Sequence, residues 1–333
     1  MLIQERLVAG LKCIDLENDH IKISILPGLG SKMIELYNKE SKTHFLLEPQ
    51  NEKKTYLKPN YGDDFSSFDT SGFDECFPTI ENVIIDTNDE ENGNQYLEFP
   101  DHGEVWSRPW NYSTLNDSLN LEIDGVKHNY KLEKNISLSG KVVRIKYTLR
   151  NFGDDKFRFL WSAHPLLKVY PKAELILPPE VTSVFLNWSS EKSIGEYGDI
   201  KKWPITIEDN GIIDLSVVQD KYLGKAVKCF TDKLKYPYGG LYYPEENESI
   251  VFYSPSAEIH YVGLWLCYGG WPEKINPGHL TVAVELSNSR TDSLAKSIKN
   301  DDCGYLAPGE SLSWEMYIEI FSGKVSSSDI FKN

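Results

Sequence analysis

Hydrophobic and polar residues alternate with a period of two along much of the chain. Residues 141–150 carry an apolar side chain at every second position, at Val143, Ile145, Tyr147 and Leu149. The same alternation recurs near the C-terminus at Leu312, Trp314, Met316, Ile318 and Ile320. Each pattern predicts a β-strand with one buried and one solvated face, as in antiparallel sheets. Turn signals such as Ser139-Gly140 recur about every ten residues, so the sequence predicts an all-β fold, a large antiparallel sandwich or barrel.

Helical periodicity is rare by comparison. One short helix is predicted over residues 292–299, with Asp292 as its N-cap. No internal repeat, low-complexity tract or linker rich in serine and proline divides the chain. Because all-β sandwiches often run past about 200 residues as one unit, we expect a single domain over residues 1–333.

Composition restricts the classes of partner. The chain has 35 basic and 50 acidic residues and a formal net charge of −15, which disfavours nucleic acids and anionic membranes because both select cationic surfaces. The longest nearly apolar run, Tyr261 to Tyr268, is far shorter than the roughly 20 residues of a membrane helix. Five scattered cysteines form no C-x-x-C pair, which is typical of reduced thiols, and no secretory leader pattern is present. We therefore expect a cytoplasmic protein.

Polar residues interrupt two apolar strands and are the first candidates for chemistry. In residues 281–286, Val282, Val284 and Leu286 form one face, and Glu285 shares the other face with two small residues, which leaves room for a ligand. His164 is expected to end a strand just before Pro165. A lone histidine at a strand end is, however, more often structural than catalytic.

Further candidates lie in loops rich in glycine, proline and aromatic residues. Residues 100–110 combine a histidine, an arginine and two tryptophans, residues 72–78 place two acids beside a glycine, and residues 263–272 hold a glycine and tryptophan cluster. Aromatic faces stack on the C–H faces of sugars, but they also fill ordinary sandwich cores, and the paired acids can simply form surface ion pairs. No histidine spacing indicates a metal site, and no dinucleotide loop or G-x-S-x-G motif occurs.

Taken together, these segments resemble the aldose 1-epimerase (galactose mutarotase) superfamily along nearly the whole chain. The resemblance is carried by P-G-L-G-S-K-M-I-E-L at 27–36, D-H-G-E-V-W-S-R-P-W at 101–110, W-S-A-H-P-L at 161–166, V-A-V-E-L at 282–286 and L-A-P-G-E-S-L-S-W at 306–314. It implies a large antiparallel β-supersandwich of the galactose mutarotase-like type, with a sugar site on its concave face.

The resemblance also implies an activity and its residues. It implies a cofactor-independent, metal-free isomerase that interconverts the α and β anomers of a sugar by opening and closing the ring. Glu285 matches the base that takes the proton of the anomeric hydroxyl, and His164 matches the acid that protonates the ring oxygen. His102 resembles a second histidine that polarises or orients this oxygen. An imidazole suits such proton exchange because it titrates near 6.5.

Substrate contacts are predicted less directly. The candidates are Asp74, Glu75, Arg108, Trp110 and Trp265. The chain departs from the family at the first histidine, which lies in H-G-E-V-W, and in the spacing H-G-x-x-x-x-R, and the family's sugar-binding aspartate has no obvious counterpart. Only six arginines occur, so a hexose 6-phosphate is disfavoured against a neutral sugar.

Two other functions stay open at this point. The same fold could serve a non-catalytic protein that binds or senses carbohydrate, although binding alone needs no matched acid and base. A lyase or hydrolase is weaker, because hydrolysis usually requires two carboxylates flanking the bond. The expected assembly is a monomer or a homodimer.

Overall fold

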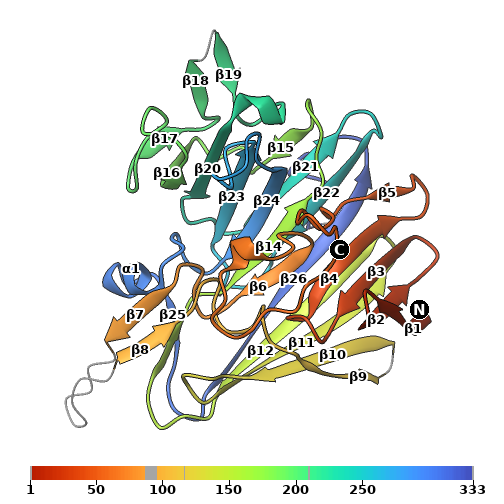
Figure 1. Ribbon diagram of the computed structural model, residues 1–333, viewed down its shortest axis with the longest axis vertical. Coiled ribbons are helices and arrows are strands. Elements are labelled where there is room, and N and C mark those ends of the chain that lie inside the picture. Colours follow the sequence, from red (N-terminus) through yellow and green to blue (C-terminus); the bar gives the residue numbers. More distant parts are fainter. Residues whose placement is uncertain (1, 87–95, 116, 209–210, 332–333) are drawn as a thin grey trace.

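Two antiparallel β-sheets packed face to face form most of the molecule (Figure 1). The computed structural model describes residues 2–86, 96–115, 117–208 and 211–331. Every pairing between the named strands is antiparallel, and two isolated bridges among the described residues are parallel. The all-β fold predicted from the alternation is confirmed, and of the two predicted architectures, sandwich and barrel, the structure is a sandwich.

The larger sheet has twelve strands. From one edge to the other it contains β1 (Leu2–Val8), β2 (Leu11–Glu17), β3 (Ile21–Leu26), β4 (Lys32–Asn38), β6 (Phe73–Cys76), β14 (Ser162–Leu167), β24 (Leu280–Ser287), β23 (Tyr261–Tyr268), β20 (Lys225–Thr231), β16 (Ser183–Ser189) and β17 (Ile200–Lys202), and β5 (Thr43–His44) pairs with β4.

The smaller sheet has eight strands. Their order is β15 (Glu174–Ile176), β21 (Tyr238–Tyr243), β22 (Glu248–Tyr253), β26 (Ser311–Ser322), β12 (Val142–Asn151), β11 (Tyr130–Ser139), β10 (Ser118–Asp124) and β9 (Asn111–Leu115). Short pairs complete the strands: β7 (Val83–Asp86) with β8 (Tyr96–Phe99), β13 (Phe157–Phe159) with β25 (Gly304–Leu306), and β18 (Thr206–Glu208) with β19 (Ile212–Asp214). The described helical segments are α1 (Leu294–Lys299) and the 3₁₀ turns η1 (Phe65–Ser67) and η2 (Lys221–Leu223).

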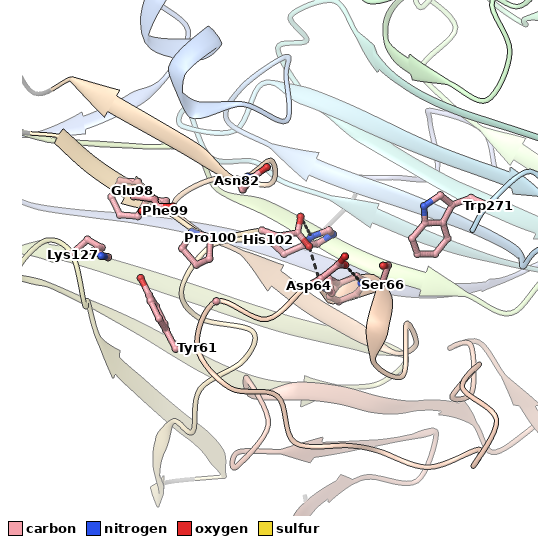
Figure 2. Close-up of a pocket in the computed structure, with 13 residues that line it drawn as sticks. Tyr61, Asp64, Ser66, Asn82, Glu98, Phe99, Pro100, His102, Lys127 and Trp271 are labelled. Carbon is pink, nitrogen blue, oxygen red and sulfur yellow. Dashed lines mark hydrogen bonds and ion pairs between the residues drawn. The ribbon is translucent and has the colours of Figure 1, made fainter. Parts of the chain in front are cut away.

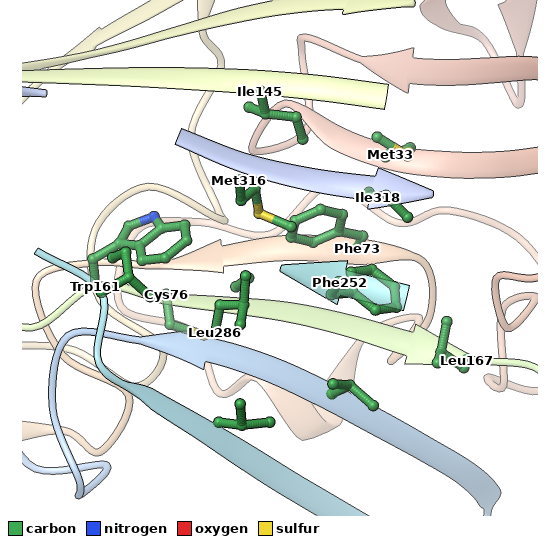
Figure 3. Packing of buried hydrophobic residues seen from close by; sticks show 14 of the residues in the cluster. Met33, Phe73, Cys76, Ile145, Trp161, Leu167, Phe252, Leu286, Met316 and Ile318 are labelled. Atoms are coloured by element: carbon green, nitrogen blue, oxygen red, sulfur yellow. The ribbon is translucent and has the colours of Figure 1, made fainter. Parts of the chain in front are cut away.

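The main core lies between the two sheets. The predicted inward residues of β12 are fully buried, while Arg144, Lys146 and Arg150 on its other face are not. Figure 3 shows side chains of both sheets meeting, among them Met33, Phe73, Leu167 and Leu286 from the larger sheet and Ile145, Phe252, Met316 and Ile318 from the smaller one. Burying this apolar surface is the main force that holds the sheets together.

The outer face of the larger sheet carries a second, smaller apolar cluster. It consists of Leu47, Phe65, Trp106, Leu166 and Ala283, with Phe68 and Trp265 packed against it. Consequently β14 is buried on both faces, and β24 is buried along all but its first residue. The cluster anchors the loops that contain Phe65 and Trp106 above the sheet, and these loops form the walls of the site described below.

Two local expectations are wrong. The helix begins at Leu294 with Ser293 as its N-cap, so Asp292 does not cap it. Strand β14 does not end at His164 but continues to Leu167: Pro165 pairs with Phe73 of β6, and the next backbone N–H, that of Leu166, donates to the Gly72 carbonyl at 2.8 Å. No helix among the described residues is long and apolar enough to cross a membrane.

Candidate active site

Three strands of the larger sheet bring a glutamate, a histidine and a lysine to the same outer face. Gly263 of β23 pairs with Glu285 of β24, and Trp265 of β23 pairs with Lys228 of β20. His164 lies on the neighbouring strand β14, between the pairs Ser162↔Ser287 and Leu166↔Ala283. Because directly paired residues share a face, the register alone places these side chains together.

A tight turn brings His102 to the same place. His102 adopts a left-handed conformation (φ 57°), and its backbone N–H donates to the Ile80 carbonyl at 2.7 Å. Gly103 follows with φ 78°, and a Cβ at this position would lie 2.1 Å from the Phe77 carbonyl oxygen, so only glycine fits. The ring of Phe65 stacks on His102 with centroids 4.1 Å apart and meets His164 edge-on at 5.5 Å.

These residues line a cavity of about 560 Å³ above the sheet. This volume lies within the usual range of small-molecule sites, roughly 300–1,000 Å³. One side is aromatic. The ring centroids of Trp188 and Trp265 are 5.6 Å apart, and Trp271 meets Trp265 edge-on with centroids 5.9 Å apart. The polar and charged residues of the lining are Ser66, Glu81, Asp101, His102, His164, Asn187, Lys228, Glu273, Lys274, His279, Thr281 and Asp292.

Glu285 lies at the bottom of this arrangement, and its side chain is fully buried. Lys228 Nζ donates a short hydrogen bond to Glu285 Oε2, and Ser162 Oγ is 3.4 Å from the same oxygen. The other oxygen, Oε1, lies 3.7 Å from His164 Nε2 and accepts no hydrogen bond from the described residues. One carboxylate oxygen is therefore neutralised by the lysine, and the other is left available beside the imidazole.

Burial and neighbouring charges set the protonation states. Burial, together with the neighbouring His102 and Lys228, lowers the pKa of His164 well below 6.5, so its imidazole is neutral at pH 7. Burial also works against the ammonium of Lys228, but Asp292 and Glu285 outweigh it and raise the pKa of this lysine above 10.5. Lys228 is thus a fixed cation and not an amine nucleophile.

Asp292 is a second carboxylate beside Lys228. Its Oδ2 accepts a 2.8 Å hydrogen bond from Asn187 Nδ2, and its Oδ1 lies 3.6 Å from Lys228 Nζ. Oδ1 is buried and accepts no hydrogen bond from the described residues. Burial raises the pKa of Asp292 to about 6, partly opposed by Lys228.

His102 is paired with the carboxylate that precedes it. Its Nδ1 lies 3.0 Å from Asp101 Oδ1, and the Phe65 backbone N–H donates to Asp101 Oδ2 at 3.0 Å. Burial raises the pKa of Asp101, but His102 and this backbone donor outweigh it, so the net shift is downward. A charged Asp101 favours a proton on Nδ1 of His102 and leaves Nε2 to face a ligand.

A second, more polar cavity of about 790 Å³ adjoins the first. The two share Phe65, Ser66, Asp101, His102 and Trp271. Figure 2 shows this cavity with His102 and Trp271 at one end and Tyr61, Lys127 and Glu98 at the other. His102 therefore stands between the two cavities.

The sequence-predicted residues divide into two groups. His102, His164 and Trp265 line the first cavity, and Glu285 lies directly beneath it. The structure places the others, Asp74, Glu75, Arg108 and Trp110, outside the lining of both cavities.

Each of these four residues has another partner. Asp74 pairs across strands with His164 but is buried against Lys32, whose Nζ is 2.8 Å away. Glu75 points to the opposite face of β6, into the sandwich interior. Arg108 donates to the Asp124 carbonyl at 2.7 Å, and the Trp110 indole donates to the Val105 carbonyl at 3.1 Å within the core.

Sequence reasoning missed Lys228, Asn187 and Asp292. Lys228 interrupts the apolar run Ala226–Phe230, which is the same signal that identified Glu285. Asp292 is predicted as a helix cap from the sequence, because an acid stands just before a helical segment. Its role in the cavity depends on contacts with β16 and β20, which local sequence does not reveal.

Comparison with known proteins by sequence finds no matching family model and no matching curated protein. Solved structures do match. A galactose mutarotase-like protein from Lactobacillus casei is 17% identical, with a TM-score of 0.65 over 93% of this chain and 100% of its own. The chain has the galactose mutarotase-like fold.

Two further structures extend this comparison. The Slr1438 protein from Synechocystis is 16% identical, with a TM-score of 0.69 over 97% of this chain and all of its own. A proposed aldose 1-epimerase from Escherichia coli K12 is 14% identical, with a TM-score of 0.64 over 92% of this chain and 98% of its own. At these identities the galactose mutarotase-like fold is what the likeness establishes.

Proposed function

We propose that the protein is a cofactor-independent aldose 1-epimerase, or mutarotase, that interconverts the α and β anomers of a sugar. The observation that carries this proposal is the pairing of Glu285 Oε1 with His164 Nε2, 3.7 Å apart beneath an aromatic cavity. Binding alone needs no buried carboxylate beside an imidazole. Opening a sugar ring needs both a proton acceptor and a proton donor.

In the proposed reaction Glu285 accepts the proton of the anomeric hydroxyl. As the bond between the anomeric carbon and the ring oxygen breaks, the imidazolium form of His164 gives its proton to that oxygen. Rotation about the C1–C2 bond of the open chain and closure from the other face invert the anomer. The two groups then exchange roles, which restores the starting protonation states. His102, fixed by Asp101 and stacked on Phe65, orients the ring oxygen.

The walls of the cavity favour a neutral sugar. Trp188, Trp265 and Trp271 offer aromatic faces for the apolar side of a pyranose ring. The buried cation, Lys228, is already paired with Glu285 and Asp292. This lysine therefore offers no free charge to a phosphate dianion, which makes a hexose 6-phosphate the less suitable substrate.

The test is an NMR exchange experiment on anomer interconversion with glucose, galactose and glucose 6-phosphate. Wild-type protein is expected to accelerate exchange of a neutral aldose, and Glu285→Gln is expected to leave it at the spontaneous rate. Equal rates for the two proteins on every sugar would contradict the proposal.

One observation favours a second candidate, a non-catalytic carbohydrate-binding protein. Lys228 holds Oε2 of Glu285, and the 3.7 Å gap to His164 is longer than a hydrogen bond. A protein that only binds sugar would shift or broaden the sugar signals without accelerating their exchange. The same NMR experiment therefore distinguishes the two functions.

A further inference from the structure

Lys228 and Asp292 converge on the cavity from separate segments of the chain. Lys228 lies on β20, and Asp292 lies just before α1. Both line the cavity, with 5% and 9% of their surface exposed. Burying two charged groups is costly unless each finds partners, so their presence beside a cavity calls for an explanation.

Internal contacts do not satisfy the pair. Lys228 Nζ donates to Glu285 and lies 3.6 Å from Asp292 Oδ1, longer than a hydrogen bond. Asp292 Oδ1 is buried and accepts no hydrogen bond from the described residues, whereas Oδ2 is held by Asn187. An acceptor and an ammonium group with donors to spare thus lie side by side. A hydroxyl group, which both donates and accepts, complements them.

The position of the pair relative to Glu285 indicates which hydroxyl would bind. The two oxygens of this carboxylate face different neighbours: Oε1 faces His164, and Oε2 faces Lys228. In a pyranose, the anomeric carbon is flanked by the ring oxygen on one side and by carbon 2 on the other. If Glu285 meets the anomeric hydroxyl and His164 the ring oxygen, carbon 2 lies on the side of Lys228.

We propose that Lys228 and Asp292 form a subsite for the 2-hydroxyl of the sugar, which makes the protein selective for 2-hydroxy aldoses. This inference rests on the proposed function, because it takes its orientation from Glu285 and His164. The ammonium donates to the hydroxyl oxygen, and the hydroxyl proton goes to Asp292 Oδ1. Lys228 thereby touches both the base and the substrate, and its position couples recognition at carbon 2 to the state of Glu285.

The test compares glucose with 2-deoxyglucose by the same NMR exchange method. A hydrogen bond to a charged group contributes enough for wild-type protein to prefer glucose in kcat/KM by about ten- to hundredfold. Asp292→Asn is expected to reduce this preference to below about threefold, mainly by slowing glucose. Asp232→Asn serves as the matched control, because Asp232 is an exposed aspartate that pairs with Arg290 outside the cavity, and it is expected to keep the wild-type preference.

Several outcomes would overturn the inference. Equal kcat/KM for glucose and 2-deoxyglucose in wild-type protein would do so without any variant, even if Asp292→Asn fails to fold. An undiminished preference in a folded Asp292→Asn protein would also do so. If no sugar is epimerised by wild-type protein, the proposed function fails, and equilibrium binding of the two sugars becomes the test of the subsite. Equal affinities would then overturn it, and tighter binding of glucose that is lost in Asp292→Asn would support it.

Discussion

Two buried lysine–glutamate pairs, whose glutamates lie on opposite faces of the larger sheet, differ in how well the carboxylate is satisfied. On the inner face, Lys134 Nζ donates to both oxygens of Glu75 at 2.9 Å and to the Ser31 carbonyl at 3.2 Å, and Tyr147 donates to Glu75 Oε1 at 3.0 Å. On the outer face, Lys228 holds only Oε2 of Glu285. Both glutamates are at most 1% exposed.

The difference separates a structural pair from a functional one. Every acceptor of the inner pair is satisfied, and neither Glu75 nor Lys134 lines either of the two cavities at the candidate site. The outer pair leaves Glu285 Oε1 and the nearby Asp292 Oδ1 without hydrogen bonds, beneath a cavity that holds His164. Burial and residue type are the same in both places, so the unsatisfied acceptors are the informative feature.

The largest expected difference between the two pairs appears when each glutamate is replaced by glutamine in turn. Glu285→Gln should slow anomer exchange by at least the roughly 100- to 10,000-fold ascribed to one acid or base group, with binding retained. Glu75→Gln should leave exchange nearly unchanged and lower the free energy of unfolding by about 3–5 kcal/mol, because it strands Lys134. NMR exchange measures the rate of anomer interconversion, and denaturant unfolding measures the free energy of unfolding. Lost exchange in a folded Glu75→Gln protein would undo the comparison.

His164→Ala is expected to reduce kcat by about a hundredfold or more, because it removes the proposed proton donor while Glu285 remains. The same substitution should change KM much less, since the ring is one of many groups that line the cavity. Steady-state kinetics on the best sugar measures both constants. An effect on kcat below threefold would contradict the acid role.

The pH dependence should be smaller and has a definite sign. The pKa of His164 is lowered by burial and by His102, Lys228 and Lys32, so the imidazolium is scarce at neutral pH. If this form is the acid, kcat/KM should rise as pH falls from 8 towards 6, up to about tenfold per unit. A rate that falls over this range would exclude imidazolium as the donor.

The smallest expected effect concerns the aromatic wall. Trp265→Ala removes a stacking surface without touching Glu285 or His164, so KM should rise by about two- to tenfold with little change in kcat. Trp110→Ala is the contrasting variant, because Trp110 is buried in the core and lines neither cavity. It should leave KM unchanged and lower stability by about 3–5 kcal/mol.

The sequence predicted the sheets well because alternation is a local property. The buried faces of β12 and β26 could be named residue by residue, and so could the outward position of Glu285 on β24. Asp74 and Glu75 could not be separated in this way, since adjacent strand residues point to opposite faces and only the pairing of β6 with β14 decides which one joins His164.

Lys228 and Asp292 show a different limit. Their role depends on which polar groups remain without a hydrogen-bond partner after folding. This in turn depends on how β16, β20, β24 and the loop before α1 pack together. No local pattern carries it. The sequence shows a lysine inside an apolar strand. It does not show whether the carboxylate partner of that lysine is fully hydrogen-bonded, as beside Lys134, or keeps one oxygen unpaired, as beside Lys228.

The place of β26 has a consequence for how the protein is made. This strand, Ser311–Ser322, is the last one in sequence among the described residues, yet it lies in the middle of the smaller sheet between β22 and β12. During synthesis, β12 and β22 emerge long before the strand that joins them, and their edges can pair with other chains meanwhile. A nascent chain that stalls before residue 311 is therefore expected to aggregate, and chaperones that cover strand edges should raise the yield of folded protein.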